Sequence, residues 1–181
     1  MKPRAPQEAR PEFISAMISE GGRPVGRTAV MKFSYLLQTL RKVPLGYRFS
    51  LYTYGPFDQE VLSDLTQAEN RKLVKSSLVA YPNGGYGYEI EARAQRAKGT
   101  TERYQDDIRW VWNRFGPYTA GELEMASTII FVDRSIKQRN EAIQIAELVR
   151  KVRGIKPHIG QERIEREARR LKDEGLLVSV A

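Results

Sequence analysis

The sequence predicts a mostly helical α+β protein, with a winged-helix-like N-terminal half packed on a helical C-terminal half. In residues 26–92 a helix, a strand, a second helix and a β-hairpin are expected in succession, which is the order of a winged helix. In residues 93–181 each apolar stripe has helical spacing, and the last two helices form a helix-turn-helix-like pair. Residues 1–25 are expected to supply an N-terminal helix and a linker.

Two helices are predicted at the start of the chain. In the first, Phe13–Ile18 places apolar side chains at helical spacing, and Gly21-Gly22 ends the helix. The second begins at Thr28, whose hydroxyl can cap the first turn, and runs to about Lys42. Apolar residues of this second helix lie on most of its faces, so we expect the helix to be largely buried.

An aromatic strand is predicted to run directly into a helix within Tyr47–Phe57, whose sequence is YRFSLYTYGPF. The segment alternates like a strand, and Pro56 suits the first turn of the helix that follows. Either this helix continues past Ala68 or a short turn replaces the recognition helix of a winged helix. A hairpin is then expected from Leu73–Tyr81 and Tyr86–Glu91, because Asn and Gly between them favour a tight turn.

At least three helices are predicted in the second half. One carries the apolar stripe of Tyr104–Phe115, and a capping box at Thr119–Glu122 opens the next. Asn140 is expected to cap a further helix. The last helix follows Pro157 and ends at Gly175, with a short apolar strand after it.

Composition favours a protein that binds an anionic polymer. The 181 residues include 30 lysines and arginines against 22 aspartates and glutamates, and the isoelectric point is about 9.8. This excess attracts polyanions, of which nucleic acid is the leading candidate. The alternative is a mildly basic protein that binds none, because its positive residues are spread along the chain.

Other function classes are excluded by what the sequence lacks. With no cysteine, neither disulfides nor thiolate metal sites can form. No apolar run approaches the roughly 20 residues that span a bilayer. The N-terminal segment lacks the apolar core of a secretion signal. We therefore expect a cytoplasmic protein with no membrane partner.

No set of residues predicts catalysis, a metal site or a cofactor. The one histidine, His158, has no second histidine or cysteine with which to hold a metal, so we interpret it as a turn or cap residue. Neighbouring carboxylates such as Asp106-Asp107 could bind Mg²⁺, but acids are also favoured in the first turn of a helix. We interpret them as structural, and the protein as non-enzymatic.

The predicted nucleic-acid surface lies around the last helical turn. Phosphate contacts there would make the affinity steeply dependent on salt. The alternative is a solvated, salt-bridged helix face. The positive residues assigned to this surface are Arg150, Lys151, Arg153, Lys156, Arg163, Arg166, Arg169 and Arg170.

A second predicted surface is rich in tyrosine and would bind a protein partner. Tyrosines beside arginine can anchor an interface or stack on bases. The alternative is that they fill the interior between the two halves. Trp110 lies off the inward stripe of its helix, which indicates either a second buried side or a dimer contact, so a homo-oligomer is also possible. The residues assigned to partner binding are Arg48, Tyr52, Tyr54, Tyr86 and Tyr88.

Two stretches resemble one family. The first comprises TAVMKFSYLLQTL and YRFSLYTYGPFDQEVLSDL, with Lys32 and Tyr35 in a helix and Tyr54-Gly55-Pro56 after an aromatic strand. The second comprises TAGELEMASTIIFV and IGQERIEREARRLKDEGLL. Together they are similar to the YwgA-like uncharacterised proteins of bacteria and archaea, and more distantly to the Panacea (SocA-like) domain.

The resemblance implies binding rather than catalysis. Panacea domains resemble antitoxins and adaptors that act by contacting other proteins. For Tyr54, Gly55 and Pro56 the resemblance implies a structural role at the bend between strand and helix. We therefore expect a non-enzymatic regulatory protein that contacts nucleic acid through a basic winged-helix-like surface. The alternative is a protein-interaction module of antitoxin or adaptor type.

Overall fold

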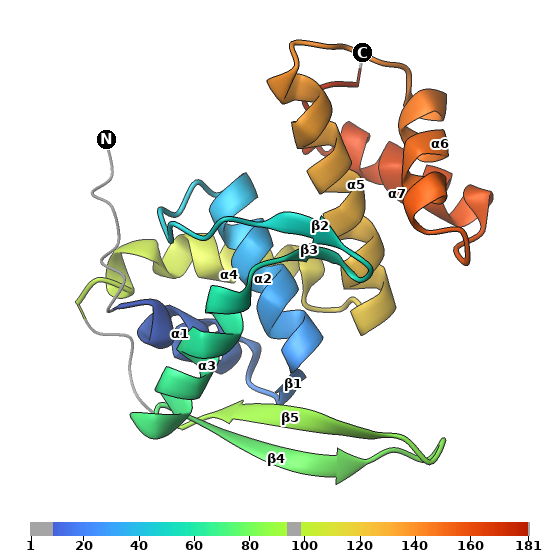
Figure 1. Ribbon diagram of the computed structural model, residues 1–181. Helices are drawn as coiled ribbons and strands as arrows, with labels where there is room; N and C mark the ends of the chain where they lie inside the picture. The colour runs from blue at the N-terminus through green and yellow to red at the C-terminus, as the bar shows by residue number, and fades with distance from the viewer. Residues whose placement is uncertain (1–8, 94–98, 181) are drawn as a thin grey trace. The chain divides into compact units, whose positions relative to one another are not determined.

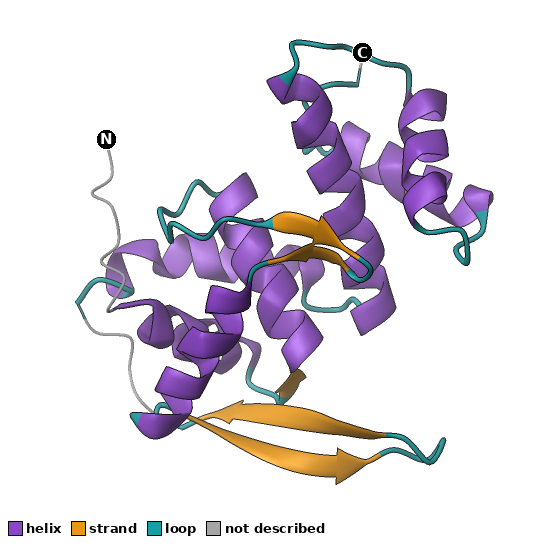
Figure 2. Cartoon of the chain, in the orientation of Figure 1, coloured by secondary structure: helices purple, strands orange, loops and turns teal. Residues whose placement is uncertain are grey.

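A computed structural model describes residues 9–93 and 99–180. Within these ranges the chain forms seven α-helices, one 3-10 helix and five short strands (Figures 1 and 2). The predicted mostly helical α+β class is thereby confirmed. No helix in the described ranges is both long enough and apolar enough to span a bilayer.

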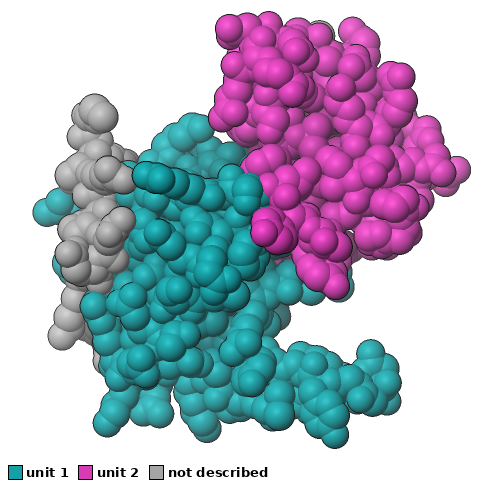
Figure 3. Space-filling model, in the orientation of Figure 1, with its two compact units in different colours: residues 1–50, 57–120 teal, residues 51–56, 121–181 magenta. Residues whose placement is uncertain are grey.

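The chain divides into two compact units, coloured separately in Figure 3. Unit 1 comprises residues 1–50 and 57–120, and unit 2 comprises residues 51–56 and 121–181. The boundary thus lies near residue 120 rather than at residue 93. Within unit 1 the indole N–H of Trp112 donates to the carbonyl of Met17, and the Trp112 ring lies 4.6 Å from that of Phe33. These contacts tie the helix after residue 104 to the N-terminal helices.

The described residues of unit 1 contain four α-helices and the 3-10 helix η2. The predicted stripe of the first helix is buried throughout, and Gly22 ends that helix in the left-handed conformation at φ 60°. The second helix is buried continuously from Val30 to Leu37, as its all-round apolar pattern predicts. The elements are α1 (Arg10–Gly21), α2 (Arg27–Leu40), α3 (Gln59–Asn70), η2 (Glu102–Tyr104) and α4 (Gln105–Phe115).

A three-stranded antiparallel sheet completes unit 1. Its order is β1 (Val25–Gly26), β5 (Tyr86–Ala92) and β4 (Val74–Ala80), so β4 forms one edge. The predicted hairpin is confirmed as β4 and β5, with Leu78 opposite Tyr88. In Figure 3 this hairpin projects from unit 1 as a narrow arm.

The predicted strand-to-helix junction in Tyr47–Phe57 is wrong. Residues 50–52 form β2 (Ser50–Tyr52), the chain reverses, and β3 (Gly55–Phe57) pairs back on β2. Gly55 adopts φ 88°, which a residue with a side chain rarely accepts, so the chain turns where we expected a helix to start. Helix α3 begins after Asp58, whose carboxylate accepts the backbone N–H of Glu60.

A buried polar network joins α1, the segment before β2 and α3. The Tyr47 hydroxyl donates to Asp64 Oδ2 at 2.9 Å, and Arg10 lies 4.4 Å from the Tyr47 ring centre and 3.5 Å from Asp64. Burial raises the pKa of the Asp64 carboxyl against the opposing effects of Tyr47 and Arg10. Burial likewise raises the pKa of the Tyr47 hydroxyl, with Asp64 adding to it. These groups bond one another within the core, so we interpret them as structural.

Unit 2 contains three helices and the tip of the β2–β3 hairpin. The capping-box helix begins one residue after Thr119, but the next helix does not begin after Asn140, which sits in a turn at φ 57°. After the last helix Val180 makes a single bridge to Ile143 rather than a strand. The helices are α5 (Ala120–Gln138), α6 (Ile145–Ile155) and α7 (Gln161–Asp173).

Candidate nucleic-acid and partner surfaces

Helices α6 and α7 pack against each other and are joined by a five-residue turn, residues 156–160. Their inner faces are apolar: α6 buries Leu148 and Val152, and α7 buries Ile164 and Leu171. Val149 of α6 and Glu167 and Ala168 of α7 are also buried. Because the buried residues recur every three or four positions, the lysines and arginines of both helices lie on the outward faces.

Seven of the eight predicted nucleic-acid residues lie on this outward surface. We call these seven the basic helical surface. On α7, Arg163, Arg166 and Arg170 are spaced as one stripe along the helix. The members of the basic helical surface are Arg150, Lys151, Arg153, Arg163, Arg166, Arg169 and Arg170, all exposed.

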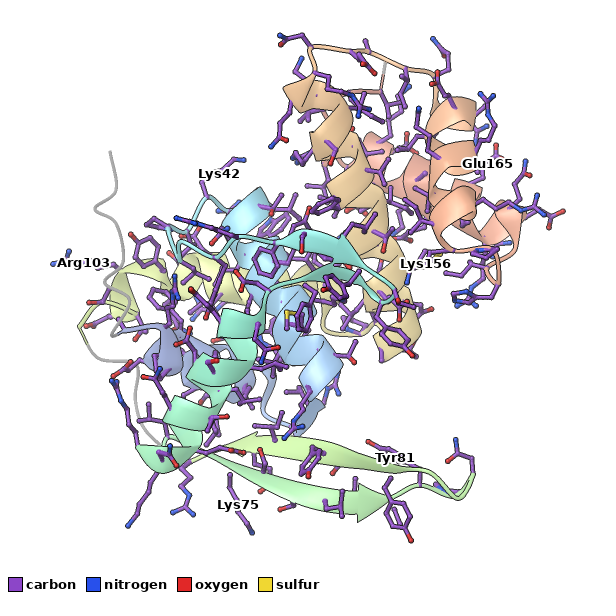
Figure 4. All side chains as sticks on the ribbon, viewed as in Figure 1. Lys42, Lys75, Tyr81, Arg103, Lys156 and Glu165 are labelled. Carbon is purple, nitrogen blue, oxygen red and sulfur yellow. The ribbon has the colours of Figure 1, made fainter. Side chains whose placement is uncertain are left out.

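For Lys156, the eighth predicted residue, the assignment to the nucleic-acid surface is wrong. Its side chain is 0 % exposed, and its ammonium donates to Glu124 on α5 and to the backbone carbonyl of Thr53. The Tyr54 ring centre lies 5.9 Å from its Nζ atom. Figure 4 labels Lys156 beside the turn of the β2–β3 hairpin. A buried and paired ammonium cannot contact a phosphate, so Lys156 anchors the α6–α7 turn instead.

Acidic neighbours occupy part of the basic helical surface. Lys151 pairs with Glu147 at 3.5 Å, Arg169 with Glu165 at 2.5 Å and Arg170 with Glu174 at 3.3 Å, each four residues apart on the helix. Within residues 9–93 and 99–180, no side-chain partner is found for Arg150, Arg163 or Arg166. These three arginines are therefore the ones best placed to meet an external anion.

The overall charge of the chain is not concentrated in unit 2. That unit has 12 lysines and arginines against 10 aspartates and glutamates, so it holds only +2 of the total of +8. If unit 2 attracts a polyanion, the attraction must therefore come from the arrangement of charge on one face rather than from the net charge of the unit.

The five predicted partner-binding residues are all exposed, in two separate hairpins. Tyr52 and Tyr54 lie at the tip of β2–β3 and are 64 % and 70 % exposed, whereas Arg48 precedes β2. Tyr86 and Tyr88 lie on β5 and are 74 % and 40 % exposed. Each of these four rings leaves a large part of its surface open to solvent.

Sequence reasoning missed one residue of the β4–β5 surface. Arg27, at the start of α2, places its guanidinium 3.8 Å from the centre of the Tyr88 ring. No local pattern indicates this pairing, because the two residues lie 61 positions apart and meet only when β1 pairs with β5.

Neither acidic nor histidine side chains assemble a site in the described residues. His158 is exposed in the α6–α7 turn, and Asp107 is buried and paired with Arg41 at 2.9 Å. Asp106 pairs with Arg109 at 3.1 Å. In the part of the chain that the structure describes, no group of three histidine or acidic residues could hold a metal ion.

Comparison with protein-family models, with curated proteins and with solved structures finds no match to this chain.

Proposed function

We propose that this chain is a non-enzymatic regulatory protein that binds nucleic acid through the basic helical surface of α6 and α7. The observation that carries this proposal is the exposed stripe of Arg163, Arg166 and Arg170, in which the first two side chains have no partner in the described residues. Guanidinium groups at this spacing can bind successive phosphate oxygens along a backbone. The turn anchored by Lys156 would hold α7 in position for that contact.

A winged-helix-like arrangement of unit 1 is part of the same proposal. The order α1, β1, α2, α3, β4, β5, with the β2–β3 hairpin inserted between α2 and α3, supports a winged helix whose first strand is β1 and whose wing is β4–β5. The sheet order β1-β5-β4 supports the same arrangement. In this arrangement α3 would occupy the place of a recognition helix. It contains Glu60 and Glu69 but no lysine or arginine. We therefore assign the phosphate contacts to α7 rather than to α3.

The double substitution Arg163→Ala/Arg166→Ala tests this proposal. Each lost phosphate contact should reduce the slope of log affinity against log salt by about 0.9. We expect the double variant to bind a duplex about tenfold more weakly near 0.1 M salt, with a slope smaller by about 2. Fluorescence anisotropy of a labelled duplex, measured across a salt series, gives both quantities.

Arg139→Ala provides the matched control, because Arg139 is an exposed arginine of unit 2 that follows α5 and pairs with Glu141. It should leave both the affinity and the slope unchanged. If the wild-type chain retains neither duplex nor single-stranded nucleic acid at low salt, nucleic-acid binding is excluded. If all three chains bind equally, the contact lies elsewhere.

The second candidate function is a protein-interaction module of antitoxin or adaptor type. It is favoured by the exposure of Tyr52 and Tyr54, since large aromatic side chains are typical anchors of protein interfaces. We expect the chain to purify from its native host as a stoichiometric complex, and Tyr52→Ala/Tyr54→Ala to lose that partner. Size-exclusion chromatography with mass spectrometry measures both results. Recovery of the wild-type chain alone would argue against this function.

A further inference from the structure

The outer edge of β4 is an open strand edge. Because the sheet order is β1-β5-β4, no strand of the described residues lies on the other side of β4 (Figure 1). The strand is seven residues long, and Lys75 is the only charged residue in it. Such an edge is a template for pairing with another strand unless it is short, charged or covered. The opposite edge, β1, has only two residues.

The hairpin's own ladder shows which backbone groups of β4 face outward. The N–H of Tyr81 donates to the carbonyl of Gly85, and the N–H of Arg93 donates to the carbonyl of Leu73. In an antiparallel pair alternate residues bond the neighbour, so the odd-numbered residues of β4 face β5. The N–H and C=O groups of Ser76, Leu78 and Ala80 therefore point to the open side.

An apolar face adjoins this edge. Val74 and Ile90 are buried at the base of the hairpin, but the same face continues outward to Leu78, Tyr86 and Tyr88. Leu78 is 62 % exposed and lies opposite Tyr88. Isolated exposed apolar side chains are normal, but here they extend the core pattern of one sheet face beyond the core.

We propose that β4 pairs antiparallel with β4 of a second copy, with the two-fold axis at Leu78. This register makes Leu78 face Leu78 of the second copy as a hydrogen-bonded pair, with Ser76 facing Ala80 on either side. About six backbone hydrogen bonds result, all from groups that point outward. On the apolar face the two leucines lie between the two Tyr88 rings and form one continuous row.

The charge distribution of β4 suits this antiparallel register. Lys75 extends away from the hairpin in Figure 4 and faces Tyr81 of the second copy. The Tyr81 ring is 41 % exposed and lies over Gly87 on the same face of the sheet as Lys75. A lysine over a tyrosine ring is a favourable contact. The two Lys75 residues lie about 20 Å apart along the strands, since each residue adds about 3.3 Å. A parallel pairing would set them side by side.

The assembly closes at two copies. Each copy uses its one long edge in the isologous contact, and the two-residue β1 leaves no comparable edge for a third. A single strand pair buries less surface than a standard stable interface. We therefore expect a weak dimer with a dissociation constant of about micromolar or above.

Single cysteines test the register, because the chain contains no cysteine of its own. Under mild oxidation Leu78→Cys should form a disulfide-linked dimer in good yield, since its two thiols meet at the axis. Lys75→Cys should form no disulfide-linked dimer, because its two thiols lie about 20 Å apart. Equal cross-linking of the two variants, or none in Leu78→Cys, would overturn the register.

A proline substitution tests the edge itself by sedimentation equilibrium up to about 1 mM chain. Leu78→Pro removes a donor that faces outward, so the β4–β5 ladder keeps its own hydrogen bonds. We expect it to weaken dimerisation at least tenfold, whereas Leu78→Thr, which keeps the N–H, weakens it less. A circular-dichroism spectrum like that of the wild type shows that Leu78→Pro is folded. A wild-type monomer at all concentrations, or open-ended polymers, would overturn the proposal.

The two proposals fail separately. The arginines of the basic helical surface belong to unit 2, whereas β4 belongs to unit 1. Loss of dimerisation in Leu78→Pro with unchanged binding of duplex by each chain would leave the nucleic-acid proposal intact. Loss of duplex binding in Arg163→Ala/Arg166→Ala with unchanged dimerisation would leave the dimer proposal intact.

Discussion

Lys156→Met is expected to lower the free energy of unfolding of unit 2 by about 3 kcal/mol or more. Breaking a buried ion pair by removing one partner typically costs about 3–5 kcal/mol, because it leaves the other charge without its partner. Here Glu124 would lose its ammonium, and the carbonyl of Thr53 would lose a donor at 2.5 Å. The Glu124 side chain is 15 % exposed and can be partly hydrated, which favours the lower end of that range.

Urea denaturation followed by circular dichroism measures this effect, and a double-mutant cycle isolates its cause. The variant Lys156→Met/Glu124→Leu removes both charges and should be more stable than Lys156→Met alone. Lys151→Met serves as the control, because Lys151 is exposed and its ion pair with Glu147 is worth about 0.3–0.5 kcal/mol. If Lys156→Met is as stable as Lys151→Met, the anchoring role of Lys156 is wrong.

Asp133→Ala is expected to release the segment after α7 and to cost about 3 kcal/mol or more. The Asp133 side chain is fully buried, and its carboxylate accepts the backbone N–H groups of Val178 and Ser179 and the Ser179 hydroxyl. Arg134 also donates to it. Truncation would leave the buried N–H of Ser179 and the partly buried N–H of Val178 without an acceptor, and an unsatisfied buried group costs about 1–3 kcal/mol.

Limited proteolysis combined with thermal unfolding distinguishes this role from simple packing. In Asp133→Ala we expect rapid cleavage after residue 175, whereas the wild type should resist it. Asp133→Asn should be intermediate, because the amide keeps one acceptor oxygen but turns an N–H₂ group toward donors. Asp173→Ala, an exposed position near the end of α7, should change stability by no more than about 0.5 kcal/mol. Equal protection in all variants would contradict the assignment.

Much of the helical content was predictable because local apolar spacing and capping signals agree with the tertiary packing. The stripe from Phe13 to Ile18 is buried as its spacing predicts, and Gly22 ends α1. The hairpin was predictable for a similar reason, since turn residues and alternating strands lie next to each other in sequence.

The β2–β3 hairpin was missed because two local signals competed. Alternation across Tyr47–Tyr54 indicates one strand, but the backbone N–H and C=O of Tyr47 bond the Gln38 side chain instead of a strand neighbour. Gly55-Pro56 suits a helix start as well as a turn, and the left-handed φ of Gly55 selected the turn. Val25–Gly26 is too short for its sequence to indicate a strand, and it exists because β5 lies beside it.

The basic helical surface was predictable in part. A charged residue between apolar positions of an amphipathic helix must point outward, so the placement of Arg163 and Arg166 follows from spacing alone. Lys156 carries the same charge but follows the end of α6, where helical periodicity no longer determines which way a side chain points. Lys156 is buried because it pairs with Glu124, which lies 32 residues earlier and meets it only in the folded chain.

The α+β class, most helices, the β4–β5 hairpin and the outward direction of the helical arginines follow from local sequence patterns, because each depends on residues a few positions apart. The unit boundary, the burial of Lys156 and the edge position of β4 arise only from folding. These depend on residues that are distant in the chain and meet only on folding, when burial selects which charges are paired inside and which strand edge stays open.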